Sequence, residues 1–159
     1  MGLTRFWYRP PSLDADTFGE WAADCRAIIA TASLPAGFRP TLDNIVPRGR
    51  IIVRGPEGKG DPVVTDGTIA LNGDASAGQE HEPFQVERDT TLRPHRRLDD
   101  AGRIFEYCKT AGKPYDAVVD ACLIALRKRF GSLVSVEEDA EAKPLVAGKQ
   151  LYAEAFGPE

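Results

Sequence analysis

The residues best suited to chemistry in this chain lie in one short segment, 109–116. Two lysines and a threonine hydroxyl occupy it, and a helical pattern begins directly after them at Pro114. Free backbone N–H groups at a helix start favour anions, and nearby ammonium groups strengthen that preference. Proline has no N–H, so the donors must come from the residues after it. The segment predicts an anion-binding turn with two further arginines, and its candidate ligands are Lys109, Thr110, Lys113, Arg54 and Arg88.

A structural interpretation of the same segment competes with the chemical one. Asp116 falls in the first turn of the predicted helix, where its carboxylate can satisfy the same N–H groups and repel an anion. The two lysines would then be solvated surface residues. The residue types favour this structural interpretation and leave the anion site open.

The cysteines and histidines offer a second kind of chemistry. Cys108 is the best candidate nucleophile, but His81 or His95 would reach it only through tertiary folding. The alternative is a buried strand residue. Cys25 and Cys122 lie on apolar helical faces, which indicates packing. The sequence has neither an HExxH motif nor a Cys-x-x-Cys pair, so we expect no metal and no cofactor.

The segment 55–61, GPEGKGD, superficially resembles a phosphate-binding loop. A Walker loop needs Gly-Lys followed by Ser or Thr and then a helix. Here Lys59 is followed by Gly60-Asp61 and then by a predicted strand. We therefore expect a plain hairpin connection.

The N-terminal strand carries an unusual alternation of aromatic and basic residues. Alternation places Phe6 and Tyr8 on one face and Arg5, Trp7 and Arg9 on the other. Arginine and tryptophan dominate binding hot spots, so the second face is a candidate partner-binding surface. The alternative, which the pattern favours, is a strand packed on a helix.

Periodicity and alternation predict the regular elements. Apolar residues at helical spacing predict helices over 16–32, 114–130 and 144–156. The buried faces of these helices are expected to include Trp21, Ile28, Val119, Leu123, Leu126, Leu151 and Phe156. Alternating or β-branched runs predict strands over 3–8, 50–54, 63–65, 68–71, 84–88, 104–108 and 133–136. The strands cluster between the helices, which is typical of the α+β class. We expect a largely antiparallel sheet of about five to seven strands with about three helices packed on one face.

Local signals refine these elements at their ends. The first helix can begin with a Thr17–Glu20 capping box, or with Asp14 or Asp16 as the cap. Gly131 stands directly after the second helix, where a left-handed residue is common.

The connections divide into turns and loops. The dipeptide Asp66-Gly67 predicts a two-residue hairpin turn in which both residues have positive φ. Residues 72–82 are rich in glycine and acid, so we expect them to be the most mobile interior segment. We expect residues 34–49 to form a long irregular crossing and residues 89–103 to form a polar loop.

Length and charge limit the class of protein. A chain of 159 residues suits a single globular domain over 1–159. The net charge of -4 disfavours a general nucleic-acid binder. No apolar run approaches the roughly 20 residues that span a membrane, and the N-terminus has no signal-peptide core. An odd number of cysteines suits a reducing compartment, so we expect a cytoplasmic location.

Three peptides carry a resemblance to other proteins. Trp-Tyr-Arg-Pro at 7–10, His-Glu-Pro-Phe at 81–84 and Cys-Lys-Thr-Ala-Gly-Lys-Pro-Tyr-Asp at 108–116 resemble a group of small bacterial proteins of similar length. No activity is attached to that group, so the resemblance implies a bacterial, single-domain protein and no site residues.

The sequence favours a non-enzymatic protein that acts by binding another protein, of the immunity or accessory-subunit type. Small size, acidic charge, long polar loops and the lack of a catalytic constellation point that way. The alternative is a small-molecule or nucleotide-binding enzyme with its anion site at residues 109–116. A deep pocket at that turn would favour the enzyme, and a flat aromatic surface would favour the interaction protein.

Overall fold

The part of the chain that the structure describes contains three α-helices and seven strands. The structure is a computed structural model and describes residues 3–35, 48–90, 97–138 and 146–157. The helices are α1 (Ala15–Ala32), α2 (Asp116–Phe130) and α3 (Val146–Phe156), with two short 3-10 turns at η1 (Ala75–Ala77) and η2 (Gly131–Leu133). None of these helices combines the length and the apolar content that a membrane crossing requires.

The strands pair into two antiparallel sheets. In the three-stranded sheet, β1 (Thr4–Arg9) lies between β6 (Ile104–Lys109) and β7 (Ser135–Glu138). In the four-stranded sheet, β4 (Thr68–Gly73) pairs with β2 (Val53–Arg54), β3 (Val63–Val64) and β5 (Phe84–Glu87). The α+β class and the antiparallel pairing are confirmed, and the strands are divided between two sheets.

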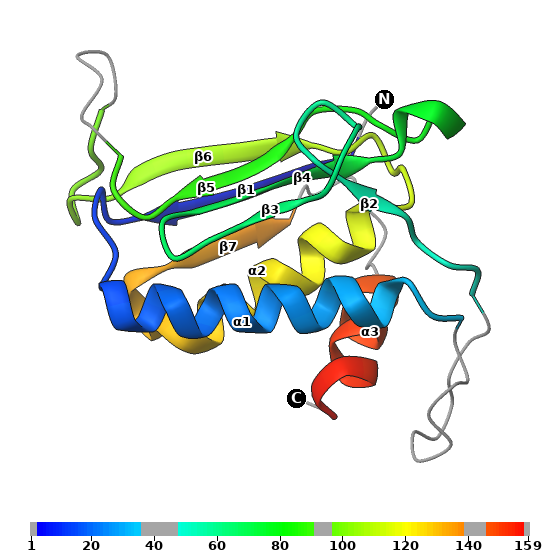
Figure 1. The fold of residues 1–159 in the computed structure, drawn as a ribbon. Helices are drawn as coiled ribbons and strands as arrows, with labels where there is room; N and C mark the ends of the chain where they lie inside the picture. The colour runs from blue at the N-terminus through cyan, green and yellow to red at the C-terminus, as the bar shows by residue number, and fades with distance from the viewer. Residues whose placement is uncertain (1–2, 36–47, 91–96, 139–145, 158–159) are drawn as a thin grey trace.

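The two sheets form one layer above the helices. Figure 1 shows β5 running beside β6, with α1, α2 and α3 below the strands. The N–H of Glu82, just before β5, donates to the main-chain oxygen of Lys109 at the end of β6, over 3.2 Å. Leaving β2, β3 and β4 aside, the path β1-α1-β5-β6-α2-β7 follows the order of a split β-α-β arrangement. That path places β1 at the centre of its sheet.

Helix α1 begins with one of the caps that the sequence allowed. The side chain of Asp14 accepts a hydrogen bond from the N–H of Thr17 over 2.9 Å, which satisfies a donor of the first turn. After α1, the N–H of Ile51 donates to the main-chain oxygen of Ala32 over 2.8 Å. Ile51 is thus bonded to the end of the helix, and the strand predicted over 50–54 is reduced to β2.

Helix α2 is buried on every side over most of its length. It packs against α1, α3 and β7, so the predicted apolar stripe is only one of its covered faces. The helix begins at Asp116, two residues later than predicted, after Tyr115 as its cap. It ends as predicted at Gly131, whose φ of 58° is left-handed and whose N–H donates to the main-chain oxygen of Arg127.

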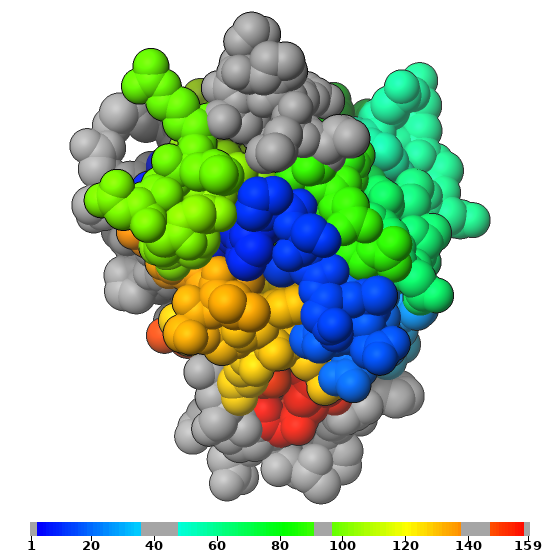
Figure 2. Space-filling view, turned by 90° about the vertical axis from the view of Figure 1, so that its left-hand side faces the viewer, coloured from blue at the N-terminus to red at the C-terminus, as the bar shows by residue number. Residues whose placement is uncertain are grey.

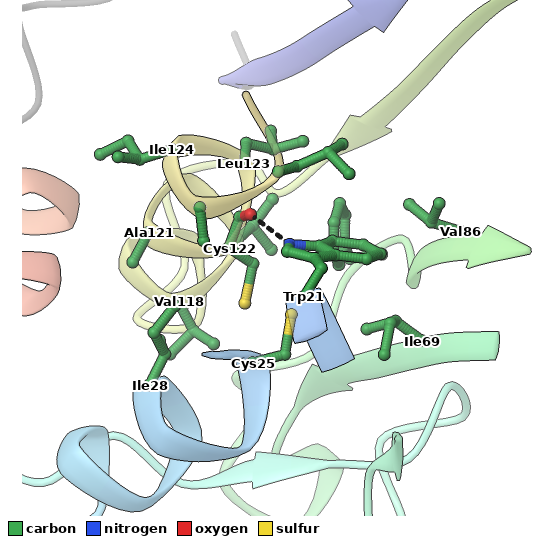
Figure 3. Packing of buried hydrophobic residues seen from close by; sticks show 14 of the residues in the cluster. Trp21, Cys25, Ile28, Ile69, Val86, Val118, Ala121, Cys122, Leu123 and Ile124 are labelled. Carbon is green, nitrogen blue, oxygen red and sulfur yellow. Dashed lines mark hydrogen bonds between the residues drawn. The ribbon is translucent and has the colours of Figure 1, made fainter. Parts of the chain in front are cut away.

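The core lies between the strands and the three helices. Trp21 donates its indole N–H to the main-chain oxygen of Cys122 over 2.8 Å, and Figure 3 shows this bond joining α1 to α2. Cys25 and Ile28 extend the same face of α1 toward Val118 of α2 in Figure 3. The predicted core residues are all fully buried, namely Trp21, Ile28, Val119, Leu123 and Leu126.

The hairpin between β3 and β4 forms where the sequence predicts it, but with a different turn. The N–H of Thr65 donates to the main-chain oxygen of Thr68 over 2.9 Å, which pairs the two residues that flank Asp66-Gly67. Neither Asp66 nor Gly67 has a positive φ, so the predicted turn conformation is wrong. The hydroxyl oxygen of Thr65 instead accepts from the N–H groups of Gly67 and Thr68, at 3.3 and 3.0 Å.

Residues 72–82, which the composition predicts to be mobile, form a hydrogen-bonded turn around η1. The buried side chain of Asn72 donates to the main-chain oxygens of Pro56 and His81, both at 2.9 Å. Its own oxygen accepts from the N–H groups of Gly73 and His81, at 2.8 and 3.0 Å. One amide therefore ties three chain segments together, a role that the composition of the segment did not indicate.

Helix α3 covers the far side of α2. Leu151 is fully buried, as predicted, whereas Phe156 is 42% exposed and only packs its ring on Tyr152 at the end of the helix. The prediction that Phe156 points inward is therefore wrong. Residues 36–47, 91–96 and 139–145 lie outside the described residues, and they include most of the first irregular crossing and His95.

Candidate functional site

The predicted anion turn is occupied by its own side chains. Thr110 is buried, and its hydroxyl donates to Oδ1 of Asp116 over 2.6 Å. The guanidinium of Arg5 binds both oxygens of the same carboxylate, with Nε at 3.1 Å from Oδ1 and Nη2 at 2.9 Å from Oδ2. The carboxylate of Asp116 thus binds Thr110 and Arg5, whereas the structural interpretation expected it to bind the N–H groups at the helix start, and no side-chain hydrogen bond caps α2 there.

The remaining donors of the turn are partly engaged as well. The N–H of Asp116 donates to the main-chain oxygen of Lys113 over 2.9 Å. The ammonium of Lys113 donates to the main-chain oxygen of Gly78 over 3.1 Å. Ala111 and Gly112 have positive φ values of 54° and 69°, which turn the chain from β6 toward α2. Of the two lysines, Lys109 is the more openly exposed.

The two arginines proposed for the anion site lie apart from each other. Arg54 faces Asp74, with Nε at 3.7 Å from Oδ1, beside an open depression of about 350 Å³ that Lys59 also lines. Arg88 pairs with Asp89 and lies near the Arg9 end of β1, whereas Lys109 pairs with the other end of that strand. The five candidate ligands therefore do not converge on one anion.

The basic face of β1 is turned into the protein. Arg5, Trp7 and Arg9 are each at most 1% exposed, which contradicts their assignment as a partner-binding surface. Arg5 lies between the carboxylates of Asp116 and Asp120, at 2.9 and 3.2 Å. Buried charges are tolerated when they are paired in this way, so the alternative interpretation, a strand packed on a helix, holds for this face.

Arg9 is satisfied mainly by main-chain oxygens. Its guanidinium donates to the carbonyls of Pro10, Glu87 and Arg88, and it also lies 3.3 Å from the carboxylate of Glu106. A guanidinium offers five donors, which suits a cluster of carbonyls. Arg9 therefore fastens the end of β5 to the end of β1.

Cys108 is placed as a packing residue. Its side chain is buried on the inner face of β6, and its thiol lies 3.5 Å from the main-chain oxygen of Glu82. Burial, together with the negative charges of Glu82 and Asp116, raises the pKa of Cys108 to about 12, so the thiol stays protonated at neutral pH. Nδ1 of His81 lies 2.7 Å from the main-chain oxygen of Lys109, and among the described residues the hydrogen bond of the thiol goes to Glu82 and not to His81.

No metal centre emerges from the described residues. Within residues 3–35, 48–90, 97–138 and 146–157, no group of three or more histidine, cysteine, aspartate or glutamate side chains converges. The carboxylates of Asp116 and Asp120 both pair with the guanidinium of Arg5.

Four aromatic side chains instead gather on the outer face of the three-stranded sheet. This aromatic face consists of Phe6 and Tyr8 of β1 with Phe105 and Tyr107 of β6. The ring of Phe105 contacts the other three, with centroids 5.7 Å from Phe6, 5.3 Å from Tyr8 and 5.9 Å from Tyr107. Phe105 is 44% exposed and Tyr107 is 58% exposed, although both are large and largely apolar. The helices lie on the opposite side of the strands (Figure 1).

Charged side chains of both signs border the aromatic face. Arg103 places its guanidinium 5.5 Å from the ring centre of Tyr8 and is also paired with Asp99. Figure 2 shows the segment that leads into β6 as yellow-green atoms at the surface, above the orange atoms of η2 and β7. Lys109 is exposed on β6, and Glu137 is exposed on β7 directly opposite Phe6. Neither forms an ion pair with the rest of the described chain.

The sequence contained part of the signal for this face. Alternation in β1 correctly separates Phe6 and Tyr8 from the basic residues, but the hot-spot residue types favour the basic side, which is the buried one. The F-E-Y alternation of β6 places Phe105 and Tyr107 on one side of that strand. Only the register, which sets Phe6 opposite Tyr107 and Tyr8 opposite Phe105, combines the two pairs into one surface.

No protein-family model matches this chain, and neither a curated protein nor a solved structure matches it. The functional argument therefore depends on the site itself.

Proposed function

We propose that this chain is a non-enzymatic protein-interaction module that binds a protein partner through the aromatic face. The observation that carries the proposal is the exposure of Phe105 and Tyr107, at 44% and 58%, within a contiguous cluster of four rings. Large apolar side chains that cluster on a surface mark interaction sites, and aromatic residues are enriched in binding hot spots.

A protein is the partner that this surface fits best. The net charge of -4 would oppose the approach of a nucleic acid, and Glu137 adds a negative charge to the face itself. The face also carries Lys109, so charges of both signs border the aromatic rings. Apolar rings with a mixed polar rim are typical of protein–protein interfaces.

The finer parts of the proposal rest on the sequence. We propose a bacterial protein, in line with the peptides at 7–10, 81–84 and 108–116. Its small size and net charge of -4 favour the immunity or accessory-subunit type. We place it in the cytoplasm, because its three cysteines are free thiols in separate elements.

The enzyme alternative has less support from the geometry. It requires an open anion site at residues 109–116, and there Thr110 and Asp116 are bonded to each other. In the depression beside Arg54, the carboxylate of Asp74 lies next to the guanidinium and offsets its positive charge. Neither place offers a cluster of uncompensated cations.

The proposal is tested by capturing the partner with matched variants. The tagged wild-type chain would be expressed in its native host with Phe105→Ser, Tyr107→Ser and a control, Phe156→Ser. Phe156 is 42% exposed on α3, so the control removes a similar exposed aromatic ring from another surface. Quantitative mass spectrometry would measure the stoichiometry of each recovered protein.

We expect one protein to be recovered in stoichiometric amount with the wild type and with Phe156→Ser. Its recovery should fall about tenfold or more with Tyr107→Ser and Phe105→Ser. Circular dichroism would confirm that all variants are folded. Equal recovery with all four chains would contradict the assignment of the aromatic face.

A further inference from the structure

We infer that the aromatic face takes a second copy of this chain, in a two-fold arrangement with the strands of β1 lying over one another. The inference rests on the proposed function, because it assigns a partner to the same face. It follows from how bulk and charge are distributed across the three strands.

Charge is divided between the two edges of the face. The strand order β6-β1-β7 places Lys109 on one side of β1 and Glu137 on the other. A two-fold axis that runs along β1 between two facing sheets brings β6 of each copy over β7 of the other. Each copy then presents its lysine to the half of the partner that carries the glutamate. Two opposite contacts form at once, and neither Lys109 nor Glu137 is placed over its own counterpart in the other copy.

Large and small side chains are also distributed unequally between β6 and β7. At the level of Tyr8, β6 carries the large Phe105 and β7 carries the small Ser135. At the level of Phe6, β6 carries Tyr107 and β7 carries Glu137. The same two-fold axis sets the ring of Phe105 over the small side chain of Ser135, and it sets the phenol of Tyr107 toward Glu137, which can accept its hydrogen bond.

A second copy therefore complements the charges of the face better than a partner whose surface carries charges of one sign. An acidic partner would meet Lys109 but repel Glu137, and a basic partner would do the reverse. Sheets that pack face to face interdigitate their side chains at about 10 Å, a spacing that exposed rings can fill. The face is self-complementary in both shape and charge, which is what a two-fold interface requires.

Charge reversal tests this arrangement. The full chain and the variants Lys109→Glu, Glu137→Lys and Lys109→Glu/Glu137→Lys would be compared by sedimentation over a range of concentrations. We expect a dimer for the wild type and a dissociation constant raised about tenfold or more in each single variant. The double variant should recover the dimer, because the two charges have exchanged places. Ser135→Trp should also yield a monomer, and the control Phe156→Ser should remain a dimer.

Other outcomes would overturn the inference. A wild-type chain that stays monomeric at millimolar concentration would exclude the second copy, while the proposed function would stand if Tyr107→Ser still loses a captured partner. A dimer that persists in Tyr107→Ser, or a double variant that stays monomeric, would place the dimer contact elsewhere. A labelled oligouridine that binds the wild type and loses affinity in Tyr107→Ser would overturn both proposals in favour of a base-stacking surface.

Discussion

Trp21 donates its indole N–H to the main-chain oxygen of Cys122 over 2.8 Å, and this bond fastens α1 to α2 inside the core. Trp7 of β1 is also buried, at 1% exposure, yet its indole N–H has no partner among the described residues. The two tryptophans fill the core in the same way but differ in their polar atom. A buried donor without a partner lowers stability, whereas a bonded donor does not.

This difference predicts unequal effects of the same substitution. Trp21→Phe should lower the free energy of unfolding by about 3 kcal/mol, because it removes packing and a buried hydrogen bond. Trp7→Phe should lower it by only about 1 kcal/mol, because the loss of an unsatisfied N–H offsets part of the lost packing. Urea unfolding of both variants measures the difference. Equal losses would show that the Trp7 donor is satisfied.

The helices could be predicted because their signals are local. Helix α1 has an apolar stripe and a capping aspartate within its own sequence, and α2 ends at Gly131 as its pattern indicates. The same holds for the strand alternation in β1. These features depend on residues close together in the chain, so the sequence alone reveals them.

The side of β1 that faces the core could not be predicted, because distant residues decide it. Alternation separates Arg5 from Phe6 but does not say which of them points inward. Arg5 is accepted in the interior because Asp116 and Asp120, more than a hundred residues later, hold its guanidinium. Two aspartates four residues apart on an apolar helix were the available sign of a buried cation.

A second prediction concerns the contact between α2 and α3. A Cβ atom on Gly148 would lie 2.1 Å from Oδ2 of Asp120, far inside contact distance. Gly148→Ala should therefore lower the free energy of unfolding by about 2–4 kcal/mol, although alanine favours a helix by about 1 kcal/mol. Thermal and urea melts would measure the loss.

The matched control for that prediction is the other helical glycine. At Gly19 of α1, the nearest atom to a new Cβ is Oδ1 of Asp66 at 3.9 Å, an ordinary contact. Gly19→Ala should thus be neutral or stabilising by up to about 1 kcal/mol. If Gly148→Ala is as stable as Gly19→Ala, the two helices do not pack as closely as the structure shows.

A third prediction tests the conformation of the β3–β4 turn. Gly67 and Gly112 both have open space around a new Cβ, but only Gly112 has a positive φ, at 69°. Gly112→Ala should lower the free energy of unfolding by about 1 kcal/mol, and Gly67→Ala should change it by less than about 0.5 kcal/mol. A larger loss of stability in Gly67→Ala would indicate that Gly67 has a positive φ, as the Asp-Gly dipeptide predicts.

The fourth prediction concerns alkaline pH and Cys108. Burial, and then the charges of Glu82 and Asp116, raise the pKa of this thiol from its ordinary 9.0 to about 12 in the folded protein. Between those two values the unfolded chain loses the proton and the folded chain keeps it. The unfolded state then binds fewer protons, so the free energy of unfolding falls as the pH rises.

Cys108→Ala removes this contribution and isolates it from other alkaline effects. The variant should be less stable than the wild type near neutral pH, because a buried side chain is truncated. As the pH rises above about 9, the wild type should lose its advantage by up to about 1.4 kcal/mol per pH unit. Urea unfolding of both chains at several pH values up to about 10.5 would follow this change. Burial of the thiol would be refuted by a stability difference that stays constant across that range, because an exposed thiol titrates alike in both states.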